Sequence, residues 1–236
     1  MCGRFTQTST LAELQKLFAF EEQPNLAPRA NVAPTQDIGI IRLENDGKTH
    51  WRSARWGLIP AWAKDLSIGA KTINARAETL AEKPAFREAF ARRRCLIPAD
   101  GFYEWKSDSG GKQPYRITLS DGRPFAFAGL WEVWRDPAED RRIESCSIVT
   151  TEAAPAIREI HHRMPVILEG AAAAVWLEPE AETAKLQALL APYAGELRAS
   201  PVSQAVNRVA NDSLDLLKPL PADAPRADGR GQFSLL

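Results

Sequence analysis

The sequence predicts an α+β fold, a single domain of mostly antiparallel strands that form a barrel-like curved sheet with flanking helices. The chain of 236 residues is long enough for one large domain with a sizeable core. Its apolar segments are mostly short and bounded by turn residues, and only a few have helical periodicity. We see no internal repeat and no clear linker. We therefore expect one domain over residues 1–219 and a flexible tail over 220–236, which is rich in Pro, Asp and Gly.

The N-terminal part of the chain predicts a strand, a helix and an extended segment. Cys2–Phe5 is expected to be strand-like. Thr10 and Glu13 fit a capping box, and apolar residues follow on one helical face, so a helix is expected from there to about Phe20. Prolines break the chain after this helix and predict an extended segment, at Pro24, Pro28 and Pro34.

The rest of the chain alternates strand and turn patterns. Asn45-Asp46-Gly47 predicts a hairpin turn, and Asp121-Gly122 predicts a second tight connection. Strands are expected over 38–43, 50–56, 114–119, 124–128, 129–135, 143–150, 166–168 and within 197–203. Residues 56–62 predict a loop. Helices are expected from Pro84 to the Arg92–Arg94 cluster, which suits a helix C-terminus, and over 154–160, 171–177 and 179–190.

The overall charge gives no general attraction to nucleic acid, because the formal net charge is zero. Its distribution is uneven, since residues 51–120 contain 13 Lys and Arg against 7 Asp and Glu. Arginine outnumbers lysine by 21 to 9, and arginine is the better bidentate ligand for phosphate. The base composition of the gene would explain the same bias, so charge alone leaves nucleic-acid binding as one alternative.

Several functional classes are disfavoured by the sequence. No apolar run is long enough to span a membrane, and the N-terminus does not resemble a signal peptide, so a cytoplasmic protein is expected. Three cysteines far apart, Cys2, Cys95 and Cys146, argue against a disulfide framework. Cysteines and histidines lack paired ligand spacing, so we expect neither a metal nor an organic cofactor.

Cys2 is the first candidate for chemistry. Removal of Met1 would leave a free α-amine and a thiol on one residue, and this pair can act on a single carbonyl carbon. The amine would form a Schiff base with an aldehyde, and the thiol would then close a five-membered thiazolidine. The pKa values of such groups, about 7.7–8.0 and about 8.5, leave part of each reactive near neutral pH. A buried small residue or the nucleophile of an amidohydrolase is an alternative, since class II glutamine amidotransferases also begin Met-Cys-Gly.

Three other polar residues are suited to proton transfer or orientation. Glu104 lies between two aromatic residues, where burial would raise its pKa and favour general acid/base work, although an exposed strand glutamate fits equally well. His161 or His162 could move protons near neutral pH. Asn74 could orient a carbonyl, amine or hydroxyl, or be an ordinary turn residue.

Arginines and tryptophans are candidates for binding DNA. Three arginines lie inside motifs rather than in charge runs and are the better phosphate ligands, namely Arg4, Arg76 and Arg163. Three tryptophans could stack on bases, although tryptophans are more often core residues, namely Trp56, Trp62 and Trp105.

Taken together, these motifs resemble the SOS response-associated peptidase (SRAP) family of abasic-site processing proteins. Segments of the expected type occur in the expected order, at 2–5, 74–79, 94–105 and 160–165, with further agreement at 127–132 and 202–207. The resemblance covers about residues 2–219. Each motif alone is modest, whereas their ordered combination is specific.

The resemblance implies a function in the DNA damage response. It implies a sensor of abasic sites in single-stranded DNA, whose N-terminal cysteine forms a reversible covalent thiazolidine link with the ring-opened sugar and shields the lesion. It also implies self-processing of the N-terminus, a hydrolase or protease label and lyase-type chemistry at abasic sites. A monomer that associates with the nucleoid and with the replication machinery is expected. Because only Met1 precedes Cys2, methionine aminopeptidase is expected to suffice here.

The resemblance also implies roles for individual residues. Cys2 would be the nucleophile, and Asn74 would position its amine or the sugar. Glu104 would be the acid/base for ring opening and imine formation. His161 would assist proton transfer to the sugar and reversal of the link. Flanking phosphates would be held by Arg4, Arg76 and Arg163, and neighbouring bases would be contacted by Trp105 with the Trp56-Gly57 loop. The alternatives are a Cys2 amidohydrolase or thiol peptidase, and a noncatalytic single-strand binding module.

Overall fold

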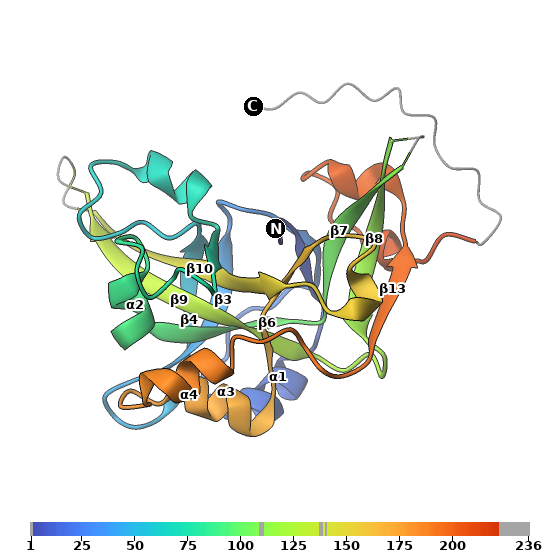
Figure 1. Ribbon diagram of the computed structural model, residues 1–236. Coiled ribbons are helices and arrows are strands. Elements are labelled where there is room, and N and C mark those ends of the chain that lie inside the picture. Colours follow the sequence, from blue (N-terminus) through green and yellow to red (C-terminus); the bar gives the residue numbers. More distant parts are fainter. Residues whose placement is uncertain (1, 109–110, 137–138, 140, 222–236) are drawn as a thin grey trace.

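The computed structural model describes residues 2–108, 111–136, 139 and 141–221. The expected tail over 220–236 therefore lies almost entirely outside the described residues. Within the described part, no helix is both long enough and apolar enough to cross a membrane. The fold class is as predicted, with mostly antiparallel strands and a few short helices around them (Figure 1).

Five strands close into a barrel. Neighbouring strands pair in the order β10-β4-β3-β6-β9, and β9 pairs again with β10, which closes the ring. All these pairs are antiparallel except β10 with β4. The five strands are β3 (Asp37–Leu43), β4 (Thr49–Trp56), β6 (Arg94–Ala99), β9 (Phe125–Arg135) and β10 (Arg142–Glu152). Three short strands extend the barrel wall, namely β5 (Asn74–Arg76), β11 (Arg163–Pro165) and β12 (Ile167–Leu168).

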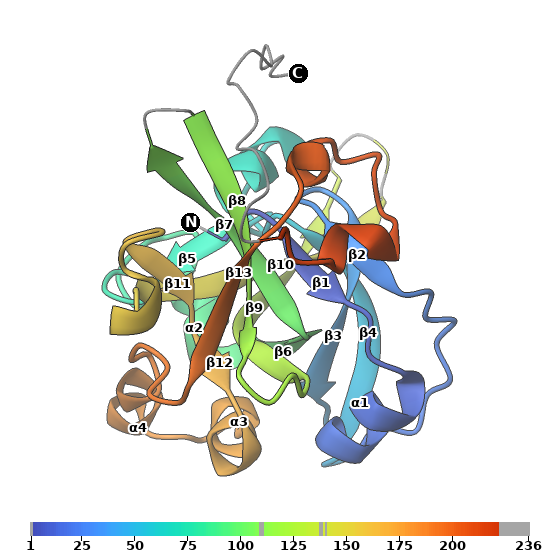
Figure 2. The same ribbon diagram turned by 90° about the vertical axis from the view of Figure 1, so that its right-hand side faces the viewer.

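A second, open sheet lies against the barrel, and Figure 2 looks onto it. Its strands follow the order β13 (Leu197–Pro201), β8 (Gly111–Leu119), β7 (Gly101–Asp108), β1 (Phe5–Gln7) and β2 (Arg29–Val32). Asp100 is the only residue between β6 of the barrel and β7 of this sheet. The interface between the two sheets is filled by aromatic rings, and Phe5 packs edge-on against Trp56 and Phe127 at centroid distances of 5.3 and 5.7 Å.

Short helices surround the strands. The helix α1 (Leu11–Phe18) has the predicted capping box, because the Thr10 hydroxyl accepts from the Glu13 amide and the Glu13 carboxylate accepts from the Thr10 amide. The other α-helices are α2 (Arg87–Arg92), α3 (Gly170–Leu177) and α4 (Thr183–Ala188). Single 3₁₀ turns occur at η1 (Leu66–Lys71), η2 (Pro155–Ile157), η3 (Gln204–Asn207) and η4 (Leu214–Leu217).

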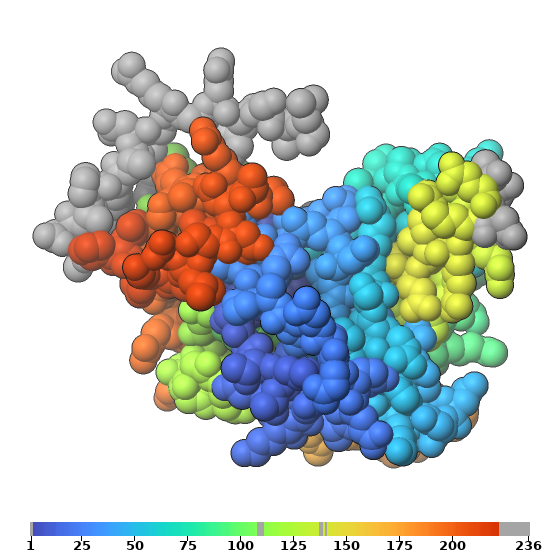
Figure 3. Space-filling model, turned by 180° about the vertical axis from the view of Figure 1, so that it is seen from behind, coloured from blue at the N-terminus to red at the C-terminus, as the bar shows by residue number. Residues whose placement is uncertain are grey.

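The C-terminal segment packs beside the N-terminal strands, as Figure 3 shows for the orange and blue parts of the surface. Asn31 on β2 makes this contact specific, because its buried amide donates to the carbonyls of Val206, Arg208 and Asn211. The carbonyl oxygen of the same side chain accepts from Arg4 at 2.9 Å. One buried amide therefore satisfies backbone groups that no sheet partner reaches.

Several predicted boundaries were wrong. The two strands expected over 124–128 and 129–135 are one strand, Phe125–Arg135. Gly129 lies within this strand, where an added Cβ would be 2.8 Å from the Cys95 sulfur, so the glycine permits close packing and does not end the strand. Strands β8 and β9 flank the predicted Asp121-Gly122 turn but belong to different sheets. The Pro84 segment forms successive turns rather than a helix, and α2 begins only at Arg87.

The other corrections concern the ends of short elements. The first strand begins at Phe5, and Cys2 to Arg4 lead into it as extended chain, with the Arg4 carbonyl accepting from the Tyr103 amide of β7 at 3.0 Å. The segment 154–160 contains only a 3₁₀ turn at 155–157, and the helix expected over 179–190 is confined to 183–188 because turns flank it on both sides. Helix α3 agrees with the prediction to within one residue, and the hairpin of β3 and β4 agrees closely.

Arg94 is expected to be the most important of the three clustered arginines for stability. Its buried guanidinium donates to the last-turn carbonyls of α2, Phe90 O and Ala91 O. It also donates to two carbonyls at the end of α3, Trp176 O in its last turn and Glu178 O just after it. Arg94→Leu would leave these carbonyls without donors, and each buried unsatisfied group costs about 1–3 kcal/mol. We expect the free energy of unfolding to fall by about 3 kcal/mol in urea titrations.

Arg92 provides the matched control for this prediction. Its side chain is 77% exposed, and within the part of the chain that the structure describes it pairs with Glu88, four residues earlier in the same helix. Arg92→Leu is expected to change the free energy of unfolding by less than about 0.5 kcal/mol. Equal effects of the two substitutions would contradict the assigned role of Arg94.

Candidate active site

Cys2 lies at the junction of the two sheets, immediately before β1. Its side chain is fully buried in the same core cluster as Phe5 and Trp56. Burial, together with the nearby Glu104 carboxylate, raises the pKa of the Cys2 thiol well above its usual range. The sulfur is therefore held protonated at neutral pH, while its closest polar contact is to the Arg4 carbonyl, 3.8 Å away.

Asn74 contacts the backbone of Cys2 directly. It begins β5, which runs parallel to β10 and is paired at Ile148. Its Nδ2 donates to the Cys2 carbonyl at 2.8 Å. Its Oδ1 is buried and accepts no hydrogen bond from the part of the chain that the structure describes. Asn74 therefore fixes Cys2 with one end of its amide and retains an acceptor at the other end.

Glu104 and His161 approach one another from different parts of the fold. Glu104 is on β7 and is 2% exposed, and burial raises the pKa of its carboxyl to about 8. His161 precedes β11, and its Nδ1 is 3.9 Å from Glu104 Oε2. Burial lowers the pKa of the His161 imidazole. At neutral pH, Glu104 is thus largely protonated and His161 largely neutral.

His161 and His162 differ in their surroundings. The rings stack at a centroid distance of 4.5 Å, but His162 is exposed whereas His161 is half-buried. The Arg163 amide donates to His161 Nδ1 at 3.0 Å, which fixes the His161 ring. Of the two histidines, His161 is therefore the one whose ring is held in place beside Glu104.

Two of the three predicted phosphate-binding arginines make internal contacts. Arg163 is 8% exposed, and its guanidinium pairs with both oxygens of Glu78 and donates to Thr150 O. Arg4 donates to Asn31 and to Val206 O. Arg76 differs because its side chain is exposed at the edge of β5.

The predicted base-contacting residues occupy three different positions. Trp56 is fully buried, donates to Ile73 O and packs on Phe5, so its ring belongs to the core under the site. Gly57 has a φ of 128°, and an added Cβ would lie 2.6 Å from the Gly69 carbonyl oxygen, so only glycine fits there. Trp105 is half-buried, and its Nε1 donates to Asn207 Oδ1 at 2.8 Å.

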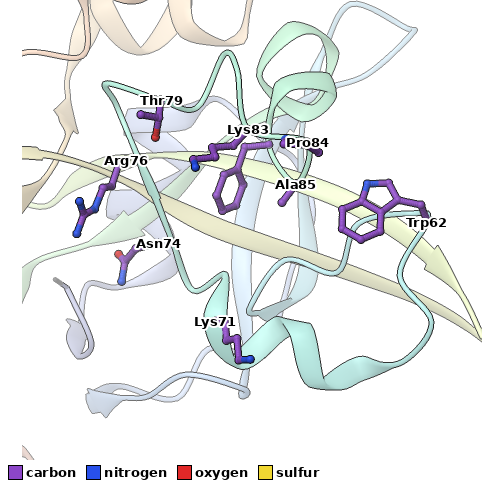
Figure 4. A pocket seen from close by; sticks show the side chains of 9 residues that line it. Trp62, Lys71, Asn74, Arg76, Thr79, Lys83, Pro84 and Ala85 are labelled. Carbon is purple, nitrogen blue, oxygen red and sulfur yellow. The ribbon is translucent and has the colours of Figure 1, made fainter.

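A cavity of about 380 Å³ opens beside Asn74 (Figure 4). Trp62 lies at its far end with 60% of its surface exposed, and Arg76 lies near Asn74. The remaining lining combines cationic and apolar side chains, namely Lys71, Thr79, Lys83, Pro84, Ala85 and Phe86. The sequence interpretation missed Lys71 and Lys83, although the positive excess of residues 51–120 indicated that cations gather in this region.

The described residues contain no group of three or more His, Cys, Asp or Glu side chains able to hold a metal ion. The groups gathered at this site are one thiol, one carboxyl that is protonated near neutral pH, one neutral imidazole and one amide. Such a set can form and break bonds to a carbonyl carbon by proton transfer.

The sequence is similar to several proteins named as abasic site processing proteins. The sequence is 45% identical over 225 residues to the abasic site processing protein YoqW of Bacillus subtilis, covering 92% of this chain and 99% of that protein. It is 31% identical to the abasic site processing protein YedK of Escherichia coli, covering 93% and 100% of the two chains. It is 30% identical to the abasic site processing protein HMCES of Gallus gallus, covering 96% and 80%.

Solved structures show the same fold. A protein from Bacteroides thetaiotaomicron superposes with a TM-score of 0.84 at 27% identity, covering 93% of this chain and all of that one. A protein from Bordetella bronchiseptica gives a TM-score of 0.74 at 32% identity, covering 86% of this chain and all of the other. The model of the SOS response associated peptidase (SRAP) family matches residues 1–209. The chain therefore belongs to the SRAP family, whose relatives named here are abasic site processing proteins.

Proposed function

We propose that this protein senses abasic sites in single-stranded DNA and crosslinks to them covalently through a thiazolidine formed on Cys2. The observation that carries the proposal is the convergence of four groups. Asn74 Nδ2 donates to the Cys2 carbonyl at 2.8 Å. Glu104 lies near enough to the Cys2 thiol to help raise the pKa of that thiol, and His161 Nδ1 lies 3.9 Å from Glu104 Oε2. The crosslink would shield the lesion from strand cleavage, and its reversal would release the protein.

The proposed reaction requires Cys2 to be the N-terminal residue. Its neutral α-amine attacks C1′ of the ring-opened sugar, and loss of one water molecule gives an imine. The thiol sulfur then adds to the same carbon, while the thiol proton passes to the imine nitrogen. The product contains the aldehyde and the aminothiol less one water. Because burial keeps the thiol protonated, the amine is the first nucleophile.

Glu104 and His161 supply the proton transfers in this scheme. With a pKa of about 8, Glu104 carries a proton at neutral pH and donates it to the ring oxygen of the closed sugar. The carboxylate then takes the proton that the attacking amine loses and passes it to the departing hydroxyl of the carbinolamine. Neutral His161 accepts a proton from the sugar and returns it when the link reverses. Asn74 Oδ1 is left to accept from the amine of Cys2 or a sugar hydroxyl.

The cavity beside Asn74 suggests how DNA is held. Arg76, Lys71 and Lys83 offer cations for phosphates, and the exposed Trp62 ring offers a surface for stacking a base. Arg4 and Arg163 would hold phosphates only by exchanging some of their internal acceptors. A single strand suits this site because a flexible backbone can bring the sugar to a thiol that is fully buried.

A gel assay tests the proposed function. Protein whose mature N-terminus is shown by mass spectrometry to be Cys2 is incubated with a single-stranded oligonucleotide containing one abasic site, and with an intact oligonucleotide of the same sequence. We expect a heat-stable shifted band with the abasic strand alone, at the summed mass less one water. The absence of that band would refute the proposal. Turnover of an amide or peptide without DNA would instead support the amidohydrolase alternative.

A further inference from the structure

We propose that Glu78 is a positioning residue for the crosslinking reaction, because it holds Arg163 so that the Arg163 backbone fixes the orientation and tautomer of His161. This inference rests on the proposed function. Glu78 follows β5, whereas His161 precedes β11, and these segments are 83 residues apart in the chain. The connection between them is the guanidinium of Arg163.

The Glu78–Arg163 pair joins three strands. Arg163 Nη1 donates to Glu78 Oε1 at 2.5 Å and Nη2 donates to Oε2 at 3.0 Å, which is the bidentate geometry of a strong ion pair. The same Nη2 also donates to Thr150 O on β10 at 2.7 Å. Since β10 lies between β5 and β11, the side chain of Arg163 fastens the strand that presents Asn74 to the strand that follows His161.

The backbone of Arg163 acts on the imidazole. Its N–H donates to His161 Nδ1 at 3.0 Å, and its carbonyl lies 3.1 Å from the same nitrogen. A backbone N–H is always a donor, so the neutral ring must offer a lone pair at Nδ1 and carry its proton at Nε2. Nδ1 then faces Glu104 as an acceptor, and Nε2–H remains the donor of the neutral ring.

This tautomer suits the proposed proton path. Nδ1 carries the lone pair of the neutral ring, so it is the atom at which His161 takes up the proton of the sugar, and it lies 3.9 Å from Glu104 Oε2. When Nδ1 becomes protonated, its N–H can donate to the Arg163 carbonyl, so the backbone of one residue accommodates both states. A ring released from Arg163 would also populate the other tautomer, whose Nδ1 already carries a hydrogen and cannot take up a proton there.

Other charged groups near His161 do not replace this link. His162 stacks on the ring and is exposed, so it does not fix which nitrogen is protonated. Lys106, on the same strand as Glu104, pairs with the exposed Glu159 at 3.4 Å. The Glu78 side chain is 48% exposed, and among the described residues its ion-pair partner is Arg163.

The test combines NMR with single-turnover kinetics. In the full chain labelled with ¹⁵N-histidine, and above the ordinary imidazole pKa of about 6.5, we expect His161 to show an unprotonated Nδ1 and a protonated Nε2. Assignment uses the loss of signals in His161→Gln. In Glu78→Ala the two nitrogens should move toward averaged positions, because both tautomers are populated. The crosslinking rate at saturating abasic DNA should fall about 10-fold, without weaker binding of intact single strands.

Two comparison variants separate positioning from a loss of stability. Glu78→Gln keeps one acceptor for Arg163 and should fall between wild type and Glu78→Ala. Glu132→Gln breaks another buried ion pair, to Arg93 at 2.7 Å, and should leave both the His161 signals and the rate unchanged.

The outcomes are distinct. Nδ1–H as the wild-type tautomer, or unchanged signals and rate in Glu78→Ala, would overturn the inference. Tighter DNA binding with an unchanged rate would do so too, because Glu78 would then merely compete with phosphate. Failure of the proposed function would give a different result. The wild-type protein would then form no crosslink with abasic DNA, while NMR would still report the tautomer of His161.

Discussion

Cys2→Ala is expected to abolish the heat-stable crosslink to abasic single-stranded DNA, in protein from which Met1 has been removed. The new N-terminal alanine keeps its α-amine and can still form an imine, but it has no sulfur to close the thiazolidine. An imine hydrolyses on heating, so the shifted band on a denaturing gel should fall to background. The position of the backbone should persist, because Asn74 binds the Cys2 carbonyl and not its side chain.

Trapping separates the two chemical steps. Borohydride reduces an imine to a stable amine, so Cys2→Ala treated with borohydride during the reaction should regain a band, whereas wild type should give one without reductant. The substitution removes a single buried sulfur and is expected to cost about 1 kcal/mol, which a thermal melt can check. A heat-stable band from folded Cys2→Ala without reductant would show that another nucleophile forms the link.

Local signals in the sequence predicted local structure well. The Thr10–Glu13 capping box and the hairpin across Asn45–Gly47 depend on contacts between residues a few positions apart, and both are present. The sheet assignment of β8 and β9 depends instead on contacts far along the chain. A turn pattern at Asp121-Gly122 is the same whether the flanking strands pair with each other or diverge into different sheets, as they do here.

In the candidate site, too, local motifs were informative, whereas properties that depend on distant contacts were not. The types of residue able to do the chemistry could be recognised from their motifs, and the structure brings Cys2, Asn74, Glu104 and His161 together. Burial could not be read from those motifs. Trp56, the last residue of β4, is in the core, whereas Trp62 in the following loop is 60% exposed beside the cavity, although both belong to one aromatic stretch of the sequence.

The residues that the arginines contact could not be predicted from the sequence either. Arg76 and Arg163 lie in similar motifs, yet Arg163 is enclosed by Glu78 and Thr150, and Arg76 is exposed. The difference arises because Arg163 faces β10 and β5, a pairing of parallel strands that no local pattern encodes. Sequence thus indicates which groups are present, and tertiary contacts decide which of them remain available to DNA.

Glu104→Gln is expected to slow crosslinking by about 10²–10⁴-fold, the usual contribution of a general acid or base. Glutamine fills the same volume and keeps a hydrogen-bonding group, but it cannot donate a proton to the sugar or to the departing hydroxyl. The rate is measured as single-turnover crosslink formation at saturating abasic DNA. Glu159→Gln is the control, because it removes an exposed carboxylate whose ion-pair partner among the described residues is Lys106.

The pH dependence gives the sharper form of this prediction. The pKa of Glu104 is about 8, so its proton is present at neutral pH and is lost as the pH rises through that value. Deprotonation of the N-terminal amine, with an ordinary pKa of about 7.7–8.0, acts in the opposite direction and increases the rate. The wild-type rate should therefore pass through a maximum, whereas the Glu104→Gln rate should rise to a plateau without declining. A decline of the same size in both proteins would mean that another group is the acid, and a similar rate in both at neutral pH would remove Glu104 from the proton path.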